Sequence, residues 1–406
     1  MNILVLSHRV PFPPNKGEKI RTFHQVQFLV AQGHDVTVLS PYEDEEERDY
    51  ARDLEKCLAI SVSMFPLKLK WLRLLRGLAQ NLPLTVAFFY NRELQATFDQ
   101  LISSGKYGAV LCSSSAMASY VFHNKKLAGP GSTSKVKLVM DFMDLDSDKW
   151  QQYQAQSGLP MKLVYRREAK LVNRLEKSCY ELFDTCFFVS DKEAELFAHQ
   201  LPESGKVRVM GNGIDTDLFY PDSTKQVSDH PVMLFTGVMN YKPNEDAVEW
   251  FVSSVWPDIL TQWPDAEFII GGMNPSQKVQ QLGKKQGVTV TGFVEDIVPY
   301  YQKAHVFVAP FRLARGLQNK ILQALACGLP VITTELGLEG IKAEVNEEIL
   351  VAGSAPEFEA QVKRLLTDKQ LYAKLSQKGP RLIHRDHSWN SLLNELAAAL
   401  KERDFE

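Results

Sequence analysis

Several features that mark other classes of protein are missing from this sequence. No apolar run approaches the roughly 20 residues that a helix needs to cross a bilayer. The first residues, MNILVLSHRV, are apolar but lack the basic start and the small-residue cleavage site of a signal peptide. The five cysteines are scattered and odd in number, with neither a disulfide framework nor metal-ligand spacing. We therefore expect a protein of the reducing cytoplasm.

Strong charge of either sign is also missing. The net charge is -3 at pH 7, which provides no general attraction to nucleic acid. With 45% hydrophobic and 23% charged residues, the chain can bury a large core as a globular protein. At 406 residues it is too long for one ordinary domain, so two domains of roughly 200 residues are expected.

What the sequence does contain is an alternation of short apolar runs with helical patterns, which is typical of parallel α/β layers. Two doubly wound, Rossmann-like units fit this pattern better than one large sheet. We expect a first domain over 1–220, a second over 221–385, and a terminal helix over 386–406 that returns to the first. The predicted strands are Ile3–Ser7, Val36–Ser40, Ala109–Cys112, Leu138–Met140, Cys186–Val189, Val232–Thr236, Glu267–Ile270, Thr289–Thr291, Val306–Ala309, Val331–Thr333 and Ile349–Val351.

One stretch, FPLKLKWLRLLRGLAQNLPL, is both basic and apolar. Its cations interleave with Trp71 and several leucines, and no acidic residue occurs between Cys57 and Arg92. Such a helix either rests on an anionic membrane surface or packs on its own domain while its cations reach solvent. The four cations that would make the membrane contact are Lys68, Lys70, Arg73 and Arg76.

Ligands of open α/β sheets bind beyond the carboxyl ends of the strands, so the loops that follow strands carry most weight. In SHRVPFPPNKGEKIR, Gly17 allows a close backbone approach before a helix, either to line a cleft or only to shape the loop. No GxGxxG is present, so a dinucleotide site is poorly supported. Asn212 opens a tight turn near the domain boundary, where a structural role competes with a place in the cleft.

The stretch LVMDFMDLDSDKW places several carboxylates after a predicted strand. Asp141 and Asp144 could bind sugar hydroxyls, act as acid or base, or cap the next helix. The alternate spacing without a turn glycine is poor for a Ca²⁺ loop, so we expect no metal.

The stretch PFRLARGLQNKILQALACGLPVITT runs from a loop into a helix that begins at about Leu317. A helix N-terminus with Gly316 beside it offers unpaired N–H groups to a phosphate. Arg315 and Lys320 add full positive charge. Asn319 and Gln323 lie one turn apart on one face, so a diphosphate near Gly316 would leave Gln323 close to an attached ribose. The competing interpretation is an exposed polar helix start.

Glycines mark other predicted strand ends of the second half. Gly237 follows VMLFT, and Lys242 lies five residues further on as a second anion contact. Gly272 follows AEFII, and Phe293 lies in TGFVED after another strand. This pattern suits a nucleotide cleft.

Taken together, LFTGVMNYKPNEDAVEWF, VTVTGFVEDIVPYYQKAHVFVAPFR and LQALACGLPVIT resemble the second domain of retaining family 4 glycosyltransferases of the GT-B fold. MNILVLSHRVPFPPNKGEKIRTFHQVQFLVAQGHDVTVLSP, FFVSDKEAELF and GNGIDTDLFYP are similar to the first domain of that family. DLDSDKW with ARGLQNKILQA looks most like the exopolysaccharide sugar transferases of exosortase/PEP-CTERM systems. The resemblance covers almost the whole chain.

The resemblance implies two Rossmann-like domains that close over an NDP-sugar, held mainly by the second domain, with transfer that needs no metal or other cofactor. Electrostatic stabilisation of the departing diphosphate would supply most of the catalysis. Catalytic roles are assigned to Lys320, Arg315 and Asp144. Donor binding is assigned to Gly237, Lys242, Gly272, Phe293, Gly316, Asn319 and Gln323, and the acceptor side of the cleft to Gly17, Asp141 and Asn212.

The sequence departs from the family at its most informative positions. Where the family has two glutamates eight positions apart, this chain has Arg315 and Gln323. Gln323 can still bond ribose hydroxyls, whereas Arg315 cannot accept a hydrogen bond. The Arg/Lys pair that the family has after the Gly237 strand is reduced to Lys242, and the first-domain catalytic histidine has no clear counterpart near Asp141.

We therefore expect a cytoplasmic retaining glycosyltransferase of exopolysaccharide biosynthesis that extends a glycan or polyprenyl-linked acceptor, either free or at the inner face of the plasma membrane. A catalytically degenerate protein that binds nucleotide-sugar or glycan is the first alternative. An NDP-sugar epimerase of similar fold is the second.

Overall fold

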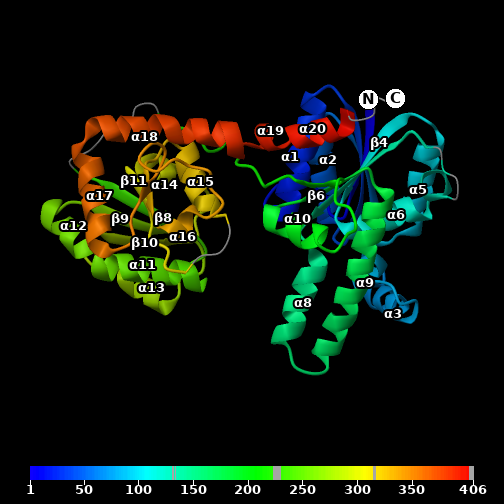
Figure 1. Ribbon diagram of the computed structural model, residues 1–406, viewed down its shortest axis with the longest axis horizontal. Coiled ribbons are helices and arrows are strands. Elements are labelled where there is room, and N and C mark those ends of the chain that lie inside the picture. The colour runs from blue at the N-terminus through cyan, green and yellow to red at the C-terminus, as the bar shows by residue number, and fades with distance from the viewer. Residues whose placement is uncertain (130–131, 133, 223–229, 314–316, 402–406) are drawn as a thin grey trace. The chain divides into compact units, whose positions relative to one another are not determined.

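The computed structural model describes residues 1–129, 132, 134–222, 230–313 and 317–401. The chain divides into two compact units (Figure 1). The first unit comprises Met1–Asn212 with Leu392–Glu406, and the second comprises Gly213–Ser391. The predicted ranges 1–220, 221–385 and 386–406 place these limits at other residues. No helix in the described ranges is long and apolar enough to cross a membrane.

The first unit is built on a parallel sheet of seven strands in the order β3-β2-β1-β4-β5-β6-β7. The order reverses between β1 and β4, which is where doubly wound sheets open a crevice. The strands are β1 (Asn2–Ser7), β2 (Asp35–Tyr42), β3 (Ser61–Pro66), β4 (Tyr107–Ser113), β5 (Lys137–Met143), β6 (Thr185–Phe188) and β7 (Val207–Val209). The helices are α1 (Gly17–Ala31), α2 (Glu46–Leu58), α3 (Lys70–Ala79), α4 (Leu84–Phe89), α5 (Arg92–Ser103), α6 (Ala118–His123), α7 (Lys125–Ala128), α8 (Asp146–Gln156), α9 (Met161–Leu182), α10 (Asp191–Ala198) and α20 (Asn394–Lys401).

The second unit repeats the plan with six parallel strands in the order β10-β9-β8-β11-β12-β13, reversing between β8 and β11. Its strands are β8 (Val232–Thr236), β9 (Glu267–Gly271), β10 (Val288–Gly292), β11 (Val306–Ala309), β12 (Val331–Thr333) and β13 (Leu350–Val351). Its helices are α11 (Lys242–Ser254), α12 (Trp256–Gln262), α13 (Gln277–Leu282), α14 (Val298–Lys303), α15 (Asn319–Ala326), α16 (Glu335–Leu338), α17 (Ala355–Thr367) and α18 (Lys369–Leu382), and α19 (Trp389–Leu392) spans its limit.

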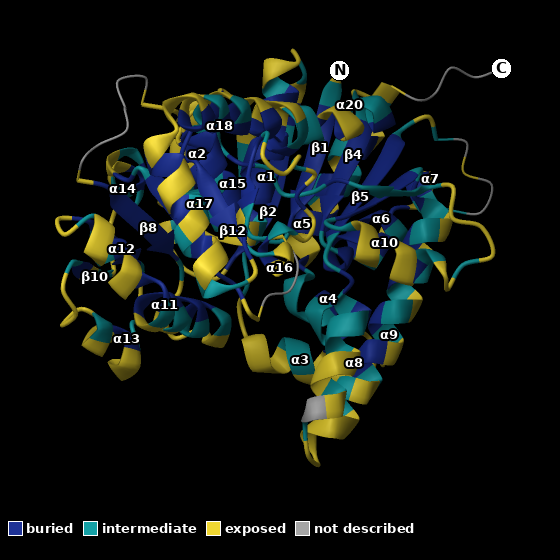
Figure 2. Ribbon diagram, turned by 60° about the vertical axis from the view of Figure 1, so that its left-hand side comes forward, coloured by how far each residue is buried: buried dark blue, intermediate teal, exposed yellow. Residues whose placement is uncertain are grey.

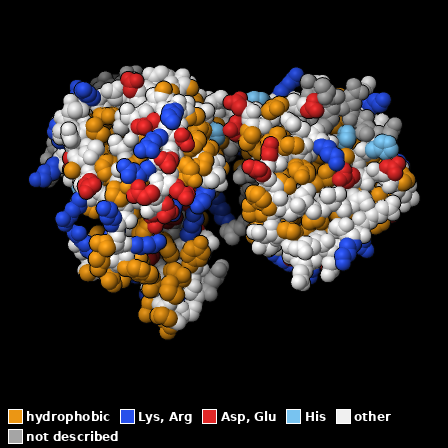
Figure 3. Space-filling view, turned by 180° about the vertical axis from the view of Figure 1, so that it is seen from behind, with side chains coloured by type: hydrophobic (Ala, Val, Ile, Leu, Met, Phe, Trp, Pro, Cys, Tyr) orange, Lys and Arg blue, Asp and Glu red, His pale blue; other side chains and the backbone are white. Residues whose placement is uncertain are grey.

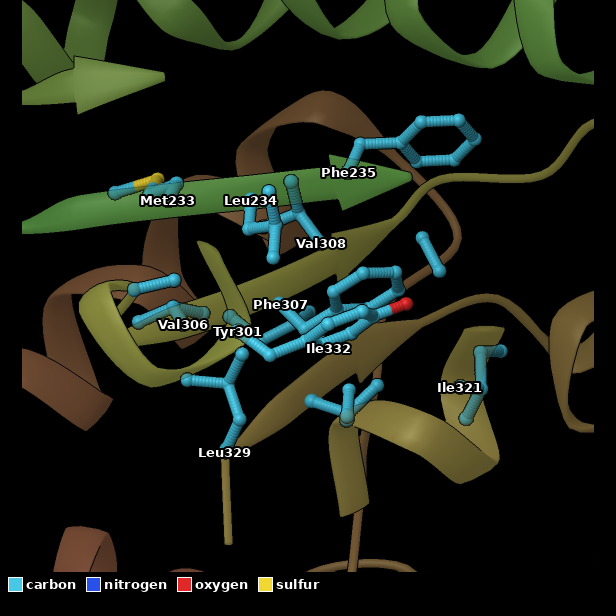
Figure 4. Packing of buried hydrophobic residues seen from close by; sticks show 14 of the residues in the cluster. Met233, Leu234, Phe235, Tyr301, Val306, Phe307, Val308, Ile321, Leu329 and Ile332 are labelled. Carbon is cyan, nitrogen blue, oxygen red and sulfur yellow. The ribbon is translucent and has the colours of Figure 1, made fainter. Parts of the chain in front are cut away.

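Burial explains why the strands read as continuous apolar runs. Parallel sheets are covered on both faces, so their strands have no solvent side. Figure 2 shows the strands as buried and the outer faces of helices such as α17 as exposed. In the second unit, Phe235 of β8 stacks with Phe307 of β11, and Tyr301 of α14 stacks on Phe307 at a centroid distance of 5.7 Å (Figure 4). All three rings belong to the hydrophobic core of the second unit.

The expected fold class, two doubly wound α/β sheets, is confirmed. Every predicted strand is present, with ends shifted by at most three residues. Two strands were missed, β3 and β7. Both are edge strands that are only partly buried, so their sequences lack the apolar run of a covered strand.

A buried ion pair joins α1 to β5 in the first unit. Arg21 donates to both oxygens of Asp141, with Nε–Oδ2 2.6 Å and Nη2–Oδ1 2.9 Å. The carboxylate also accepts from Gln25 Nε2 at 2.5 Å and from the Met143 amide at 3.2 Å. Arg21 Nη1 donates to the Asn212 side chain and to the Gly211 carbonyl, both at 3.1 Å. Asp141 and Asn212 therefore hold α1 in place at the carboxyl end of the sheet.

Replacing Asp141 with Ala should lower the free energy of unfolding of the first unit by about 3–5 kcal/mol, because the buried Arg21 guanidinium loses its counter-charge. Hydrogen exchange of the β5 amides measures the loss. Asp49→Ala is the matched control, since it removes an exposed pair with Arg52 at 2.8 Å and should cost less than about 1 kcal/mol. A cost for Asp141→Ala no larger than that of the control would contradict the assignment.

Candidate active site

A hollow of about 710 Å³ lies at the carboxyl ends of β8 and β9, beside α14 and α15. It is at the point where the strand order of the second sheet reverses, the usual ligand position in such sheets. Six of the residues assigned to donor binding or catalysis from the sequence line it: Gly237, Gly272, Phe293, Asn319, Lys320 and Gln323.

Two glycines form the floor of this hollow. The Gly237 amide donates to the Gly271 carbonyl at 3.0 Å, and the Gly272 amide donates to the Gly292 carbonyl at 3.2 Å. Gly272 has φ +139°, and a Cβ there would lie 1.8 Å from the Gly237 carbonyl oxygen. Only glycine lets the two strand ends approach so closely. The backbone is thereby left open to a ligand.

Lys320 projects from the first turn of α15 into the hollow. Its Nζ donates to Asn244 Oδ1 at 2.7 Å and lies 5.3 Å and 5.0 Å from the ring centroids of Phe235 and Phe311. Removal from water lowers the pKa of Lys320 to about 8. No carboxylate pairs with it in the part of the chain that the structure describes. A half-buried cation with a neutral oxygen and two rings as neighbours is set up to receive an anion.

Asn244, which sequence reasoning missed, orients this lysine. Its side chain is buried in the first turn of α11, and its Nδ2 donates to the Val238 carbonyl at 3.0 Å. That bond turns the amide oxygen, and not the nitrogen, toward Lys320. The sequence signal for Asn244 was a polar amide just inside a helix that starts with Lys-Pro. In sequence, this pattern cannot be told from an ordinary exposed helix start.

Gln323 lies one turn beyond Lys320 and belongs to a hydrogen-bond chain that the sequence did not reveal. The buried Tyr301 hydroxyl donates to Gln323 Oε1 at 3.1 Å, and the Thr236 hydroxyl is 2.6 Å from the Tyr301 hydroxyl. The amide oxygen is thus held by Tyr301. The amide nitrogen forms no hydrogen bond with a described residue and remains able to donate to a ligand.

The other residues assigned to the second half lie elsewhere. Lys242 stands at the start of α11 with an exposed side chain, 3.9 Å from the Glu245 carboxylate, and does not line the hollow. Arg315 and Gly316 fall outside the described residues. Helix α15 begins at Asn319, two residues later than expected.

The residues assigned to the acceptor side belong to the first unit. Gly17 begins α1, while Asp141 and Asn212 are both engaged by Arg21. Asp144 follows β5 and pairs with Lys149 of α8. No group of three or more His, Cys, Asp or Glu side chains that could hold a metal is found in the described ranges.

His8, just after β1, is a further polar group at the carboxyl end of the first sheet, and sequence reasoning passed it over. Its Nδ1 lies 3.3 Å from the Ser113 carbonyl oxygen at the end of β4. Burial lowers the pKa of His8 to about 4, so the ring is neutral at physiological pH. Because a carbonyl only accepts, Nδ1 carries the proton and Nε2 keeps a lone pair.

Gly272→Ala should lower the free energy of unfolding of the second unit by about 3–5 kcal/mol, because the alanine would have a positive φ and its Cβ would overlap the Gly237 carbonyl. Gly292→Ala is the matched control. Gly292 has φ +68° but open space where a Cβ would lie, so about 1–2 kcal/mol is expected. Urea unfolding of both variants makes the comparison. Equal losses would mean that the two strand ends are not in close contact.

Solved structures share the fold over the whole chain. HepE from Anabaena, solved in complex with UDP, aligns with a TM-score of 0.65 and 14% identity, covering 99% of this chain and 100% of that one. Sucrose-phosphate synthase from Thermosynechococcus elongatus aligns with a TM-score of 0.56 and 18% identity over 98% of each chain. The chain therefore has the GT-B fold of glycosyltransferases.

The sequence comparisons address the family. Residues 230–368 match the family model "Glycosyl transferases group 1", and these residues contain the whole lining of the hollow. This part of the second unit is therefore similar in sequence to group 1 glycosyl transferases. An "Uncharacterized 44.6 kDa protein in cps region" of Klebsiella pneumoniae is 21% identical over 365 residues, which are 86% of this chain and 87% of that protein. A phosphatidyl-myo-inositol mannosyltransferase of Propionibacterium freudenreichii is 25% identical over 172 residues, 41% of this chain and 42% of that one.

Proposed function

We propose that this protein is a retaining glycosyltransferase that moves a sugar from an NDP-sugar to a glycan or polyprenyl-linked acceptor in exopolysaccharide biosynthesis. The observation that carries the proposal is Lys320, a cation without a carboxylate partner among the described residues, in a glycine-floored hollow. Relatives support it, since one comes from a cps region and another is a mannosyltransferase. The UDP bound to HepE makes UDP the first probe to use.

The diphosphate of the donor would replace the Asn244 oxygen as the main partner of Lys320. The first turn of α15 adds N–H groups and a partial positive charge beside it, and the Gln318 side chain does not cap that turn. As the sugar leaves, negative charge grows on the diphosphate, and a cation already in place stabilises it without reorganisation. A side-chain cation and a helix N-terminus would then do the work of a metal, so transfer should continue in EDTA.

The nucleoside end of the donor would extend past Gln323 toward Phe293. The free amide nitrogen of Gln323 can donate to a ribose hydroxyl while Tyr301 holds its oxygen. The Phe293 side chain is 71% exposed at the rim of the hollow, where a ring can lie against a nucleobase. Gly17 stays assigned to the acceptor side from the sequence, and Asp144 and Arg315 keep the catalytic roles assigned from the sequence.

Lys320→Ala should weaken UDP binding about 10- to 100-fold, the usual worth of a hydrogen bond to a charged group, and should abolish transfer. Lys242→Ala is the matched control, because that exposed lysine lies outside the hollow, and it should change the affinity less than about threefold. Titration calorimetry measures both. Unchanged UDP affinity in Lys320→Ala would count against the site.

The pH dependence of UDP binding follows from the lowered pKa of Lys320. The free protein loses the Lys320 proton near pH 8, and a bound diphosphate restores it, so binding takes up a proton above that pH. Affinity should fall about tenfold per pH unit above 8. Calorimetry in buffers of different ionisation enthalpy detects the uptake. Lys320→Arg should remove the dependence, since arginine stays charged. A wild-type affinity that is flat from pH 7 to 10 would contradict this.

The alternative is a protein that binds the donor without turnover. It is favoured by Arg315 and Gln323, which stand where the resembled family has glutamates. Incubation with a panel of UDP- and GDP-sugars separates the two, because an active transferase releases NDP slowly to water even without acceptor. Tight binding with no release would favour the alternative.

A further inference from the structure

Helices α8 and α9 form an antiparallel hairpin that projects from the sheet of the first unit, with its turn at 157–160 (Figure 1). Helices α3 and α4 are fastened to it. Arg167 of α9 donates to the carbonyls of Gly77 and Leu82 at 3.3 and 3.0 Å, and the buried Glu168 accepts from the Leu84 amide at 2.7 Å. We call residues 69–82, which contain α3, and the α8–α9 hairpin together the hairpin platform.

Large apolar side chains stand exposed on this platform. The most exposed are Trp71 at 77%, Leu159 at 73% and Leu69 at 71%. Figure 3 shows hydrophobic side chains gathered at this end of the unit. Apolar groups concentrated in this way mark an interaction surface. The remaining members are Leu72, Leu75, Leu78, Leu82, Tyr153, Met161 and Leu163.

A basic hollow of about 910 Å³ runs between α8 and α9, which we call the hairpin groove. Five cations of α9 line it at spacings of three or four residues, along about 22 Å of helix. None of the five forms an ion pair or a side-chain hydrogen bond with a described residue. No acidic residue occurs between Asp148 and Glu168. The five are Lys162, Arg166, Lys170, Arg174 and Lys177.

The cations of α3 are less available than those of the groove. Lys70 lies 3.5 Å from the Glu43 carboxylate, and Arg73 donates to the carbonyls of Lys68, Phe88 and Tyr90. Of the four cations considered for a membrane contact, Lys70 and Arg73 are therefore engaged within the protein. Lys68 and Arg76 are exposed. The hairpin groove therefore holds most of the platform's positive charge that is unpaired among the described residues, and an anionic partner would meet it there.

The occupant has to satisfy both charge and hydrocarbon. A free phosphate or an acidic polysaccharide would match the groove but would leave Leu159, Met161 and Leu163 in water beside Lys162. A bilayer with anionic lipids matches both features, since phosphates lie next to hydrocarbon at its surface. We propose that the hairpin platform docks on such a bilayer, with lipid phosphates in the hairpin groove and the hairpin turn among the acyl chains.

This inference extends the membrane contact that was one of two interpretations of the α3 sequence. Its test uses no sugar donor, so its failure would leave the proposed transfer reaction standing. The full chain is floated with vesicles of phosphatidylcholine, alone or mixed with phosphatidylglycerol. Lys162→Gln/Arg166→Gln/Lys170→Gln should bind the anionic vesicles about a hundredfold less tightly. Lys278→Gln/Lys284→Gln/Lys285→Gln removes the same charge from exposed lysines of the second unit and should bind as the wild type does.

A second pair of variants tests the hydrocarbon contact. Leu159→Ser/Leu163→Ser keeps every charge and should bind anionic vesicles at least about tenfold less tightly. Leu313→Ser/Leu336→Ser, exposed leucines of the second unit, is the control and should bind normally. Circular dichroism melting checks that all variants are folded. Equal binding to neutral and anionic vesicles would overturn the proposal. The proposal would also be overturned if the serine variant bound vesicles as its control does while the groove variant lost only its binding to a soluble acidic polysaccharide.

Discussion

The feature on which the account depends is a lysine ammonium partly withdrawn from water with no carboxylate beside it in the described chain. Desolvation of a charge is costly, and among the described residues the Asn244 oxygen and the faces of Phe235 and Phe311 compensate Lys320. The surrounding structure fixes that compensation. The Val238 carbonyl orients Asn244, and the aromatic core holds the rings. An anion that binds here gains a preorganised partner, which is what a departing diphosphate needs.

The first unit shows the opposite arrangement of a buried charge. Arg21 is met by both oxygens of Asp141 and by Asn212, so the pair is complete and holds α1 against the sheet. The contrast gives a physical way to sort the charged residues of this chain. A charge held by several protein oxygens builds the fold, as at Arg21 and Arg73. A charge that has neither a carboxylate partner nor several protein oxygens among the described residues, as at Lys320 and along the hairpin groove, is available to a ligand.

The features that the sequence predicts are those that depend on neighbouring residues, and the features it misses depend on contacts between residues distant in sequence. Covered strands, and glycines at their ends, are local patterns, so the two sheets, Gly237 and Gly272 were accessible in advance. The edge strands β3 and β7 were not, because partial burial leaves no apolar run. Asn244 and Tyr301 could not be identified, since their importance comes from hydrogen bonds to residues distant in sequence. Asp141 looked like a candidate ligand for the same reason: its partner Arg21 lies 120 residues earlier.

The central claim is that the hollow of the second unit holds the diphosphate of a nucleotide-sugar. A crystal structure of the protein soaked with a UDP-sugar tests it most directly. The account predicts diphosphate oxygens within hydrogen-bond distance of Lys320 Nζ, with the ribose at Gln323. A nucleotide bound elsewhere, with Lys320 still donating to Asn244, would contradict it.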